Sequence, residues 1–271
     1  MTNIVAIIQA RMNSSRLPGK VLLDIQDHPM LYHVVERLRR VERVSQIVIA
    51  TSDQEADTPI ITYANEIDVD IFSGSETDVL ARYWGAAQKA KADIILRITA
   101  DCPLLDPVLI DNLIVFHLNS NADYSSNVMQ RTCPRGLDAE IFSVDVLGQA
   151  NSRGFQPRHR EHVTAFIYEN SHLFRLMNFD VTGELRRPDL RLCVDTGADI
   201  ELLREIYRRY YVTGEIIDVR TVIRWLDTEP YWKAINMTSE EEHLDRNTLE
   251  GVQQIKLMDS SQEGVGQIGD Q

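Results

Sequence analysis

A short segment near the amino end groups three cations with small polar residues. Arg11, Arg16 and Lys20 are interleaved with asparagine, serine and glycine, and Pro18-Gly19 marks a turn. Guanidinium and ammonium groups beside exposed backbone N–H groups are suited to neutralising a triphosphate. The segment is therefore a candidate polyphosphate site. The alternative interpretation is a solvated basic loop.

Two aspartates each follow an apolar run that is typical of a buried strand. Asp101 follows residues 93–99, and Asp195 follows residues 190–194. The carboxyl ends of parallel strands meet at one edge of a sheet, the edge where such folds bind ligands. Mg²⁺ takes one or two carboxylates together with substrate phosphate oxygens. The pair is thus a candidate Mg²⁺ site, although helix capping is the alternative for either residue.

A glycine-containing turn offers a second place for a nucleotide. Gly74 and Ser75 could let the backbone approach a flat base, and Arg82 could reach a phosphate or a carboxylate from the following helix. A plain strand-to-helix turn with a surface arginine is the alternative.

Two polar clusters could line a pocket for a polyhydroxylated, anionic second substrate. In the first, two acids lie two residues apart, so they share one face of an expected strand. Bidentate arginine contacts to a carboxylate or phosphate would suit the second substrate. A network of surface ion pairs is the alternative, and a lone histidine is more often structural than a general base. The candidate substrate-binding residues are Arg135, Asp138, Glu140, Arg160, Glu161 and His162.

Two further motifs fail on their context. Residues 264–269 fit G-x-G-x-x-G, but no strand precedes them and no helix follows them. The D-x-D motif of Asp68 and Asp70 comes before an expected strand, at the wrong edge for the basic loop.

Strand and helix patterns alternate along the first part of the chain. This alternation predicts an α/β fold with a mostly parallel, doubly wound sheet. Thr77 is the expected cap of a helix that runs to Lys91, and one helix is expected over residues 160–168. The strands expected on this basis are 4–10, 46–50, 69–72, 93–99, 124–127, 137–142, 173–179 and 190–194.

Composition narrows the class of protein. The net charge of −13 over 271 residues argues against a nucleic-acid partner. No apolar run approaches the roughly 18 residues that span a bilayer, so no membrane partner is expected. Three widely spaced cysteines favour the cytoplasm. We expect residues 1–237 to form the catalytic domain, and the polar tail 238–271 either to be poorly ordered or to serve assembly instead of chemistry.

Several of these segments resemble the sequence motifs of a known family. Residues 9–20 resemble the A-R-x-x-S-x-R-L-P-x-K signature of the sugar-acid cytidylyltransferases, which include the KDO and acylneuraminate enzymes. Residues 99–104 resemble the G-D-x-P-L motif of that family, with Ala100 in place of glycine, and residues 194–199 resemble V-D-T-x-x-D. The likeness covers about residues 1–226. Three further segments, 78–83, 136–140 and 160–164, resemble the spore-coat polysaccharide branch in particular.

The resemblance implies an α/β nucleotidyltransferase fold of the glycosyltransferase-A type with CTP as the donor. It implies Mg²⁺ on Asp101 and Asp195, and cytosine near the turn at Gly74. The residues implied to bind the nucleotide are Ala10, Arg11, Ser15, Arg16, Lys20, Gly74, Ser75 and Arg82. Those implied to be catalytic are Arg11, Arg16, Lys20 and Asp101.

The resulting hypothesis is Mg²⁺-dependent transfer of a cytidylyl group from CTP to a small anionic sugar, either a sugar acid or a sugar phosphate. Pyrophosphate is released, and the product serves cell-surface polysaccharide biosynthesis. The sugar-pocket segments of the KDO and acylneuraminate branches are absent, so the acceptor is not carried over. A glycosyltransferase that uses a nucleotide sugar and a non-catalytic nucleotide-binding subunit are the alternatives. Relatives of this kind often pair, which suggests a homodimer.

Overall fold

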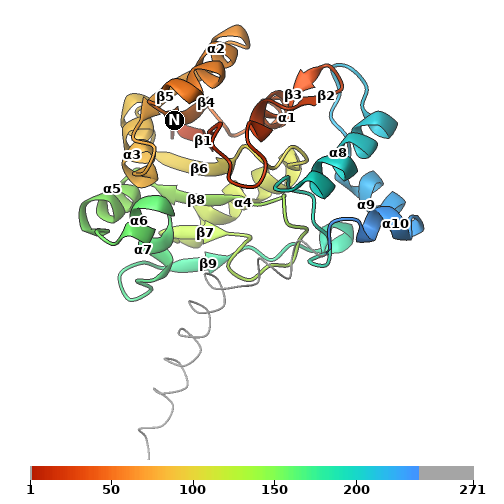
Figure 1. The fold of residues 1–271 in the computed structure, drawn as a ribbon. Coiled ribbons are helices and arrows are strands. Elements are labelled where there is room, and N and C mark those ends of the chain that lie inside the picture. Colours follow the sequence, from red (N-terminus) through yellow and green to blue (C-terminus); the bar gives the residue numbers. More distant parts are fainter. Residues whose placement is uncertain (1, 238–271) are drawn as a thin grey trace, which may run out of the picture.

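The computed structural model describes residues 2–237, whose centre is one sheet of seven strands. Their order is β5-β4-β1-β6-β8-β7-β9 (Figure 1). Neighbours are parallel from β5 to β6, β8 runs antiparallel to both β6 and β7, and β9 is parallel to β7. The predicted α/β fold with a mostly parallel sheet is therefore confirmed. The strands are β1 (Ile4–Gln9), β4 (Gln46–Ser52), β5 (Asp70–Gly74), β6 (Ile94–Thr99), β7 (Tyr124–Ser126), β8 (Glu140–Ser143) and β9 (Leu176–Asn178).

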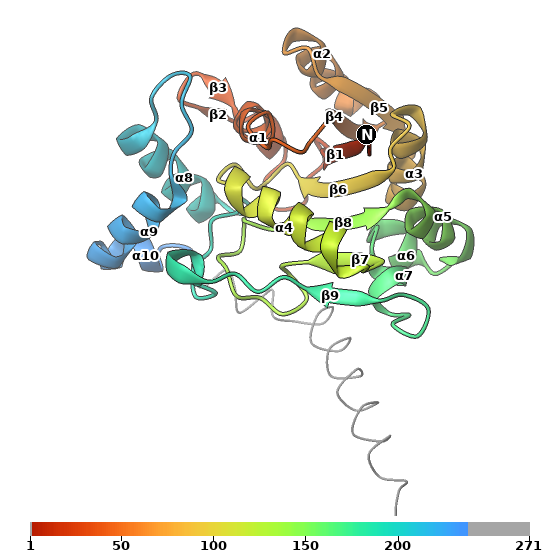
Figure 2. The ribbon, with the colours of Figure 1, turned by 180° about the vertical axis from the view of Figure 1, so that it is seen from behind.

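Helices cover both faces of the sheet, because the central strands are apolar on both sides. Along β1, Ile4, Ala6 and Ile8 pack in one core cluster, and Val5 and Ile7 pack in another. Figure 2 shows α4 lying across the face opposite to α3 and α5. The first cluster includes residues of α1 (Met30–Leu38), α2 (Thr58–Glu66) and α4 (Pro107–Ser120). The second includes residues of α3 (Val79–Lys89), α5 (Val144–Arg153) and α7 (Ala165–Tyr168).

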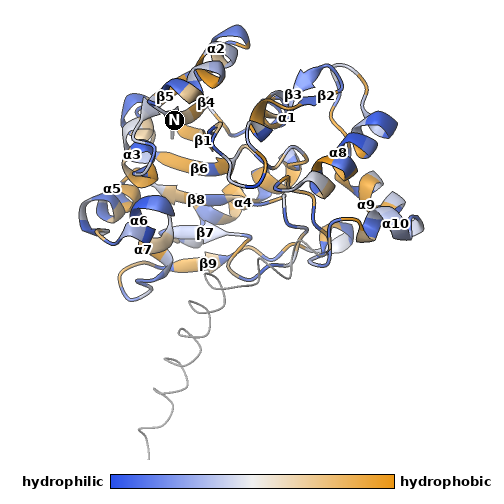
Figure 3. Ribbon diagram, viewed as in Figure 1, coloured by the Kyte–Doolittle hydropathy of each residue, from blue (hydrophilic) through white to orange (hydrophobic). Residues whose placement is uncertain are grey.

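A third group of helices forms its own core cluster beside the sheet, on the right in Figure 1. It consists of α8 (Gly197–Tyr210), α9 (Val219–Thr228) and α10 (Pro230–Ala234), which pack near the short hairpin of β2 (Asp24–Ile25) and β3 (His28–Pro29). Figure 3 shows that hydrophobic residues concentrate in the central strands and on the inner sides of helices. The remaining elements are α6 (Pro157–Glu161) and three 3₁₀ turns, at Lys20–Leu22, Glu55–Asp57 and Gly183–Leu185.

Several local predictions are wrong. Asp78, not Thr77, caps α3, since its carboxylate accepts the Ala81 N–H at 2.9 Å. The expected helix over 160–168 is two short helices, because the chain is extended at His162 between them. Residues 190–194 form only an isolated bridge between Arg135 and Arg191. The tail 238–271 and the G-x-G-x-x-G motif lie outside the described residues.

Buried His33 on α1 anchors the hairpin that follows the basic loop. Its Nε2 lies 2.8 Å from the carbonyl oxygen of Ile25, so the neutral ring donates a hydrogen bond there. Burial lowers the pKa of His33 to about 4, with smaller contributions from His28 and Arg37. Protonation of this ring therefore favours the unfolded chain.

Because the folded pKa lies below the unfolded value, neutral His33 contributes its full stability above about pH 6.5. That contribution, of order 3 kcal/mol, is lost as the pH falls towards 4. We expect His33→Gln to show a shallower decrease in the free energy of unfolding over this range, measured by urea titration. Exposed His172 supplies the control His172→Gln. Equal acid slopes in His33→Gln and the unmodified protein would contradict this assignment.

Candidate active site

The basic loop leaves β1 and folds back on itself. The carbonyl oxygen of Met12 accepts the N–H groups of Ser14 at 2.9 Å and Gly19 at 2.8 Å. Gly19 has φ +72°, a left-handed conformation that glycine adopts without steric cost. The following 3₁₀ turn directs Lys20 inward, where it is 8% exposed. The loop residues Arg11, Ser15 and Arg16 stay exposed, and Ala10 is buried.

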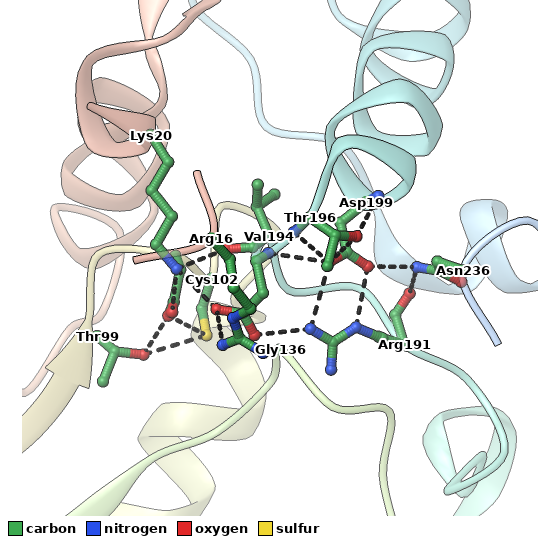
Figure 4. A network of polar contacts seen from close by, with 12 residues as sticks. Arg16, Lys20, Thr99, Cys102, Gly136, Arg191, Val194, Thr196, Asp199 and Asn236 are labelled. Atoms are coloured by element: carbon green, nitrogen blue, oxygen red, sulfur yellow. Dashed lines mark hydrogen bonds and ion pairs between the residues drawn. The ribbon is translucent and has the colours of Figure 1, made fainter. Parts of the chain in front are cut away.

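The ammonium group of Lys20 lies between the two predicted metal ligands. Its Nζ donates to Asp101 Oδ2 at 2.9 Å, to Asp195 Oδ1 at 2.8 Å and to the carbonyl oxygen of Val194 at 2.7 Å (Figure 4). Burial by itself would lower the pKa of Lys20, but the two carboxylates outweigh it and hold that pKa above its usual value. The structure thus brings together three predicted site residues from distant parts of the sequence.

Asp195 contacts two arginines in addition to Lys20. Arg16 lies 2.9 Å from Oδ1 of Asp195, and Arg191 lies 2.6 Å from its Oδ2. Burial would raise the pKa of Asp195, yet these cations lower it to about 2. The Asp101 carboxylate also accepts the hydroxyl of Thr99 at 2.6 Å. Both carboxylates are therefore surrounded by hydrogen-bond donors.

Asp195 reaches this position without a sheet strand. The N–H of Val194 donates to the carbonyl oxygen of Asp101 at 2.9 Å, which fixes the two acids side by side. Gly136, with φ +105°, lets the opposite backbone approach, since a Cβ there would lie 2.5 Å from the carbonyl carbon of Leu192. Backbone pairing between Arg135 and Arg191 continues this contact.

The predicted base-binding turn lies at the end of β5. The Ser75 hydroxyl accepts the N–H of Asp78 at 3.0 Å, and the Ser75 carbonyl accepts Arg82 Nη1 at 3.0 Å. Arg82 is only 1% exposed, and within residues 2–237 its Nε and Nη2 have no hydrogen-bond partner. Burial lowers the pKa of Arg82, and Arg11 lowers it further. Nucleotide binding by Gly74, Ser75 and Arg82 stays a prediction.

The predicted substrate-binding residues fall in separate places. Asp138 precedes β8 instead of sharing it with Glu140, and it pairs bidentately with Arg131 at 2.6 and 2.9 Å. Buried Glu140 pairs with Arg97 and accepts the hydroxyls of Tyr124 and Thr164. Arg160 binds Asp78 and Asn151, whereas Glu161 and His162 are exposed. Their part in binding a sugar stays a prediction.

The donor chemistry of the acid pair suits a hard divalent cation. Asp101 and Asp195 supply carboxylate oxygens that already converge on one ammonium group. Two protein carboxylates are enough for Mg²⁺ when phosphate oxygens and water supply its remaining ligands. Among the described residues, no group of three or more His, Cys, Asp or Glu side chains is arranged to hold a metal.

No helix in residues 2–237 is long and apolar enough to cross a membrane.

Asp57 is a residue of this region that the sequence did not single out. It is 1% exposed, and its Oδ1 accepts the N–H of Met12 at 2.6 Å. Its Oδ2 accepts the N–H of Ser52 at 3.1 Å and the hydroxyl of Thr51 at 3.1 Å. Asp57 therefore fastens the start of the basic loop to the end of β4.

We expect Asp57→Asn to weaken CTP binding. The amide NH₂ of asparagine is a donor and would face the N–H and hydroxyl donors that the carboxylate now accepts, so the basic loop would be held less firmly. The unsatisfied group should lower the free energy of unfolding by about 1–3 kcal/mol. Isothermal titration with CTP and urea unfolding measure the two effects. Asp70→Asn, on the exposed start of β5, is the control. Unchanged CTP affinity in a folded Asp57→Asn protein would contradict a role in holding the loop.

Comparison with known proteins places this geometry in a class. The fold resembles CMP:2-keto-3-deoxy-manno-octonic acid synthetase complexed with CTP, with a TM-score of 0.56 and 21% identity over 77% of this chain and 99% of that chain. A cytidylyltransferase from Leptospira borgpetersenii gives a TM-score of 0.79 and 30% identity over 86% of this chain and 97% of that one. The fold is therefore that of the nucleotidyltransferases of the glycosyltransferase-A type.

Sequence comparison is more specific. The family model described as cytidylyltransferase matches residues 5–217. The spore coat polysaccharide biosynthesis protein SpsF of Bacillus subtilis is 33% identical over 224 residues, which are 81% of this chain and 91% of that protein. The chain belongs to the cytidylyltransferase family, a family of CTP-using nucleotidyltransferases.

Proposed function

We propose that this protein transfers the cytidylyl group of CTP to an anionic sugar and releases pyrophosphate. An acceptor oxygen forms a bond to the α-phosphorus while the bond from that phosphorus to the bridging oxygen of pyrophosphate breaks. A hydroxyl acceptor also passes its proton to water or to the departing pyrophosphate, whereas an anionic oxygen has none to lose. The observation that supports the proposal is the Lys20 ammonium held by both Asp101 and Asp195.

The charges of this cluster are balanced without a ligand. Arg16, Lys20 and Arg191 face three carboxylates, those of Asp101, Asp195 and Asp199. If Arg16 and Lys20 move to a triphosphate, one cation is left facing three carboxylates, a net charge of −2. A divalent cation neutralises that charge.

We assign Mg²⁺ to Asp101 and Asp195 on this basis. When bound, the ion supplies Lewis-acid polarisation of a phosphate oxygen. Lys20 and Arg16 would stabilise the negative charge that develops on the departing pyrophosphate, together with Arg11 and the loop N–H groups. Positioning and electrostatics would account for most of the rate, as in other phosphoryl transfers.

The class of acceptor sugar and the biosynthetic role of the product are also proposals. We propose a sugar acid or sugar phosphate for cell-surface polysaccharide, on the likeness to SpsF. Residues 1–237 would be the catalytic domain, and a homodimer stays a prediction. The cytoplasmic location also stays a prediction; Cys102, Cys133 and Cys193 are free and buried.

Pyrophosphate release tests the proposal directly. The four nucleoside triphosphates are each combined with a panel of sugar acids and sugar phosphates. We expect release with CTP, Mg²⁺ and one class of acceptor. Asp101→Asn should lower kcat by about 10²–10³-fold, the usual cost of removing one electrostatic group from a transition state. Its melting temperature should stay close to that of the unmodified protein.

Asp111→Asn is the matched control, because Asp111 is a partly buried carboxylate on α4 that pairs with Arg43. Full turnover by Asp101→Asn would contradict the metal assignment. Transfer from a nucleotide sugar without consumption of CTP would instead favour a glycosyltransferase.

A further inference from the structure

Arg191 contacts the predicted metal ligand from the side away from Lys20. We infer that it is a positioning residue, which holds the Asp195 carboxylate so that Oδ1 faces Asp101. This inference rests on the proposed function, because it gives Asp195 the metal role. No motif in the sequence singles out Arg191.

The contacts of Arg191 fix both the place and the plane of the carboxylate. Its Nη2 donates to Oδ2 of Asp195 at 2.6 Å, and its Nε donates to Oδ1 of Asp199 at 2.9 Å. The Arg191 side chain is 2% exposed, so water does not compete for these bonds. With Oδ2 occupied, Oδ1 of Asp195 is directed to Lys20 and Arg16.

Asp199 ties the same unit to the start of α8. Its side chain is fully buried, and its Oδ2 accepts the backbone N–H groups of Asp195 and Thr196, each at 2.9 Å. Asn236 closes the network (Figure 4), since its Nδ2 donates to Oδ1 of Asp199 at 2.9 Å and to the Arg191 carbonyl oxygen at 3.1 Å. Asp199 thus sets the backbone of Asp195, and Arg191 sets its carboxylate.

The shape of the arginine side chain matters as much as its charge. A guanidinium presents a rigid fork of donors that meets two carboxylates at once, whereas a lysine offers a point charge on a flexible stem. Partners that orient metal-binding side chains typically change metal affinity by 10–100-fold when they are replaced. Arg191→Lys keeps the charge and removes the fork, so it separates orientation from electrostatics.

The test measures the coupling between metal and nucleotide. The dissociation constant of CTP is measured by calorimetry without and with Mn²⁺, in the absence of acceptor, and the ratio of the two values is the coupling. We expect Arg191→Lys to lower this ratio about tenfold. Arg37→Lys is the control, since Arg37 is 2% exposed and donates to the carbonyl oxygens of Leu105 and Ile217, away from the two aspartates.

The outcomes are distinct. A ratio in Arg191→Lys equal to or larger than that of the unmodified protein overturns the inference and leaves the proposed function standing. A ratio of one in the unmodified protein overturns both. If Arg191→Lys does not fold, Asn236→Ala should lower the ratio in the same direction, because it loosens Asp199 without removing the arginine. An unchanged ratio in folded Asn236→Ala contradicts the inference.

Discussion

One ammonium group shared by two carboxylates organises this protein. Lys20 draws Asp101 and Asp195 together, although 81 residues separate it from the first and 175 from the second. Two ionised acids at such short range repel each other unless a cation lies between them. The side chains of Lys20, Asp101 and Asp195 are 10%, 25% and 16% exposed, so salt screens these ion pairs less than it screens pairs at the surface.

The fold supplies this cluster from three rigid sources. The basic loop leaves the end of β1 and is fastened by Asp57, Asp101 follows β6, and Asp195 precedes the capped start of α8. The carboxyl edge of the parallel strands thus brings together charged side chains that are far apart in the sequence. Arg11 and Ser15 of the same loop are exposed.

The sequence predicted what depends on local pattern. The alternation of strands and helices predicted the sheet. The meeting of Asp101 with Asp195 was also predicted, although only Asp101 follows a strand of the sheet. The pattern failed at residues 190–194, whose alternating apolar side chains are typical of a strand but pair at one position only. Asp57 could not be found, because beside Thr58 and Pro59 it is typical of a helix start, whereas its partner Met12 lies 45 residues away. Arg191 and Asn236 are likewise defined by contacts that no spacing reveals.

The most direct measurement is a crystal structure with a non-hydrolysable CTP analogue and Mg²⁺. We expect Nζ of Lys20 to leave Asp101 and Asp195 for phosphate oxygens, and the two carboxylates to hold the ion instead. A structure in which the triphosphate is bound while Lys20 still bridges both acids would contradict it.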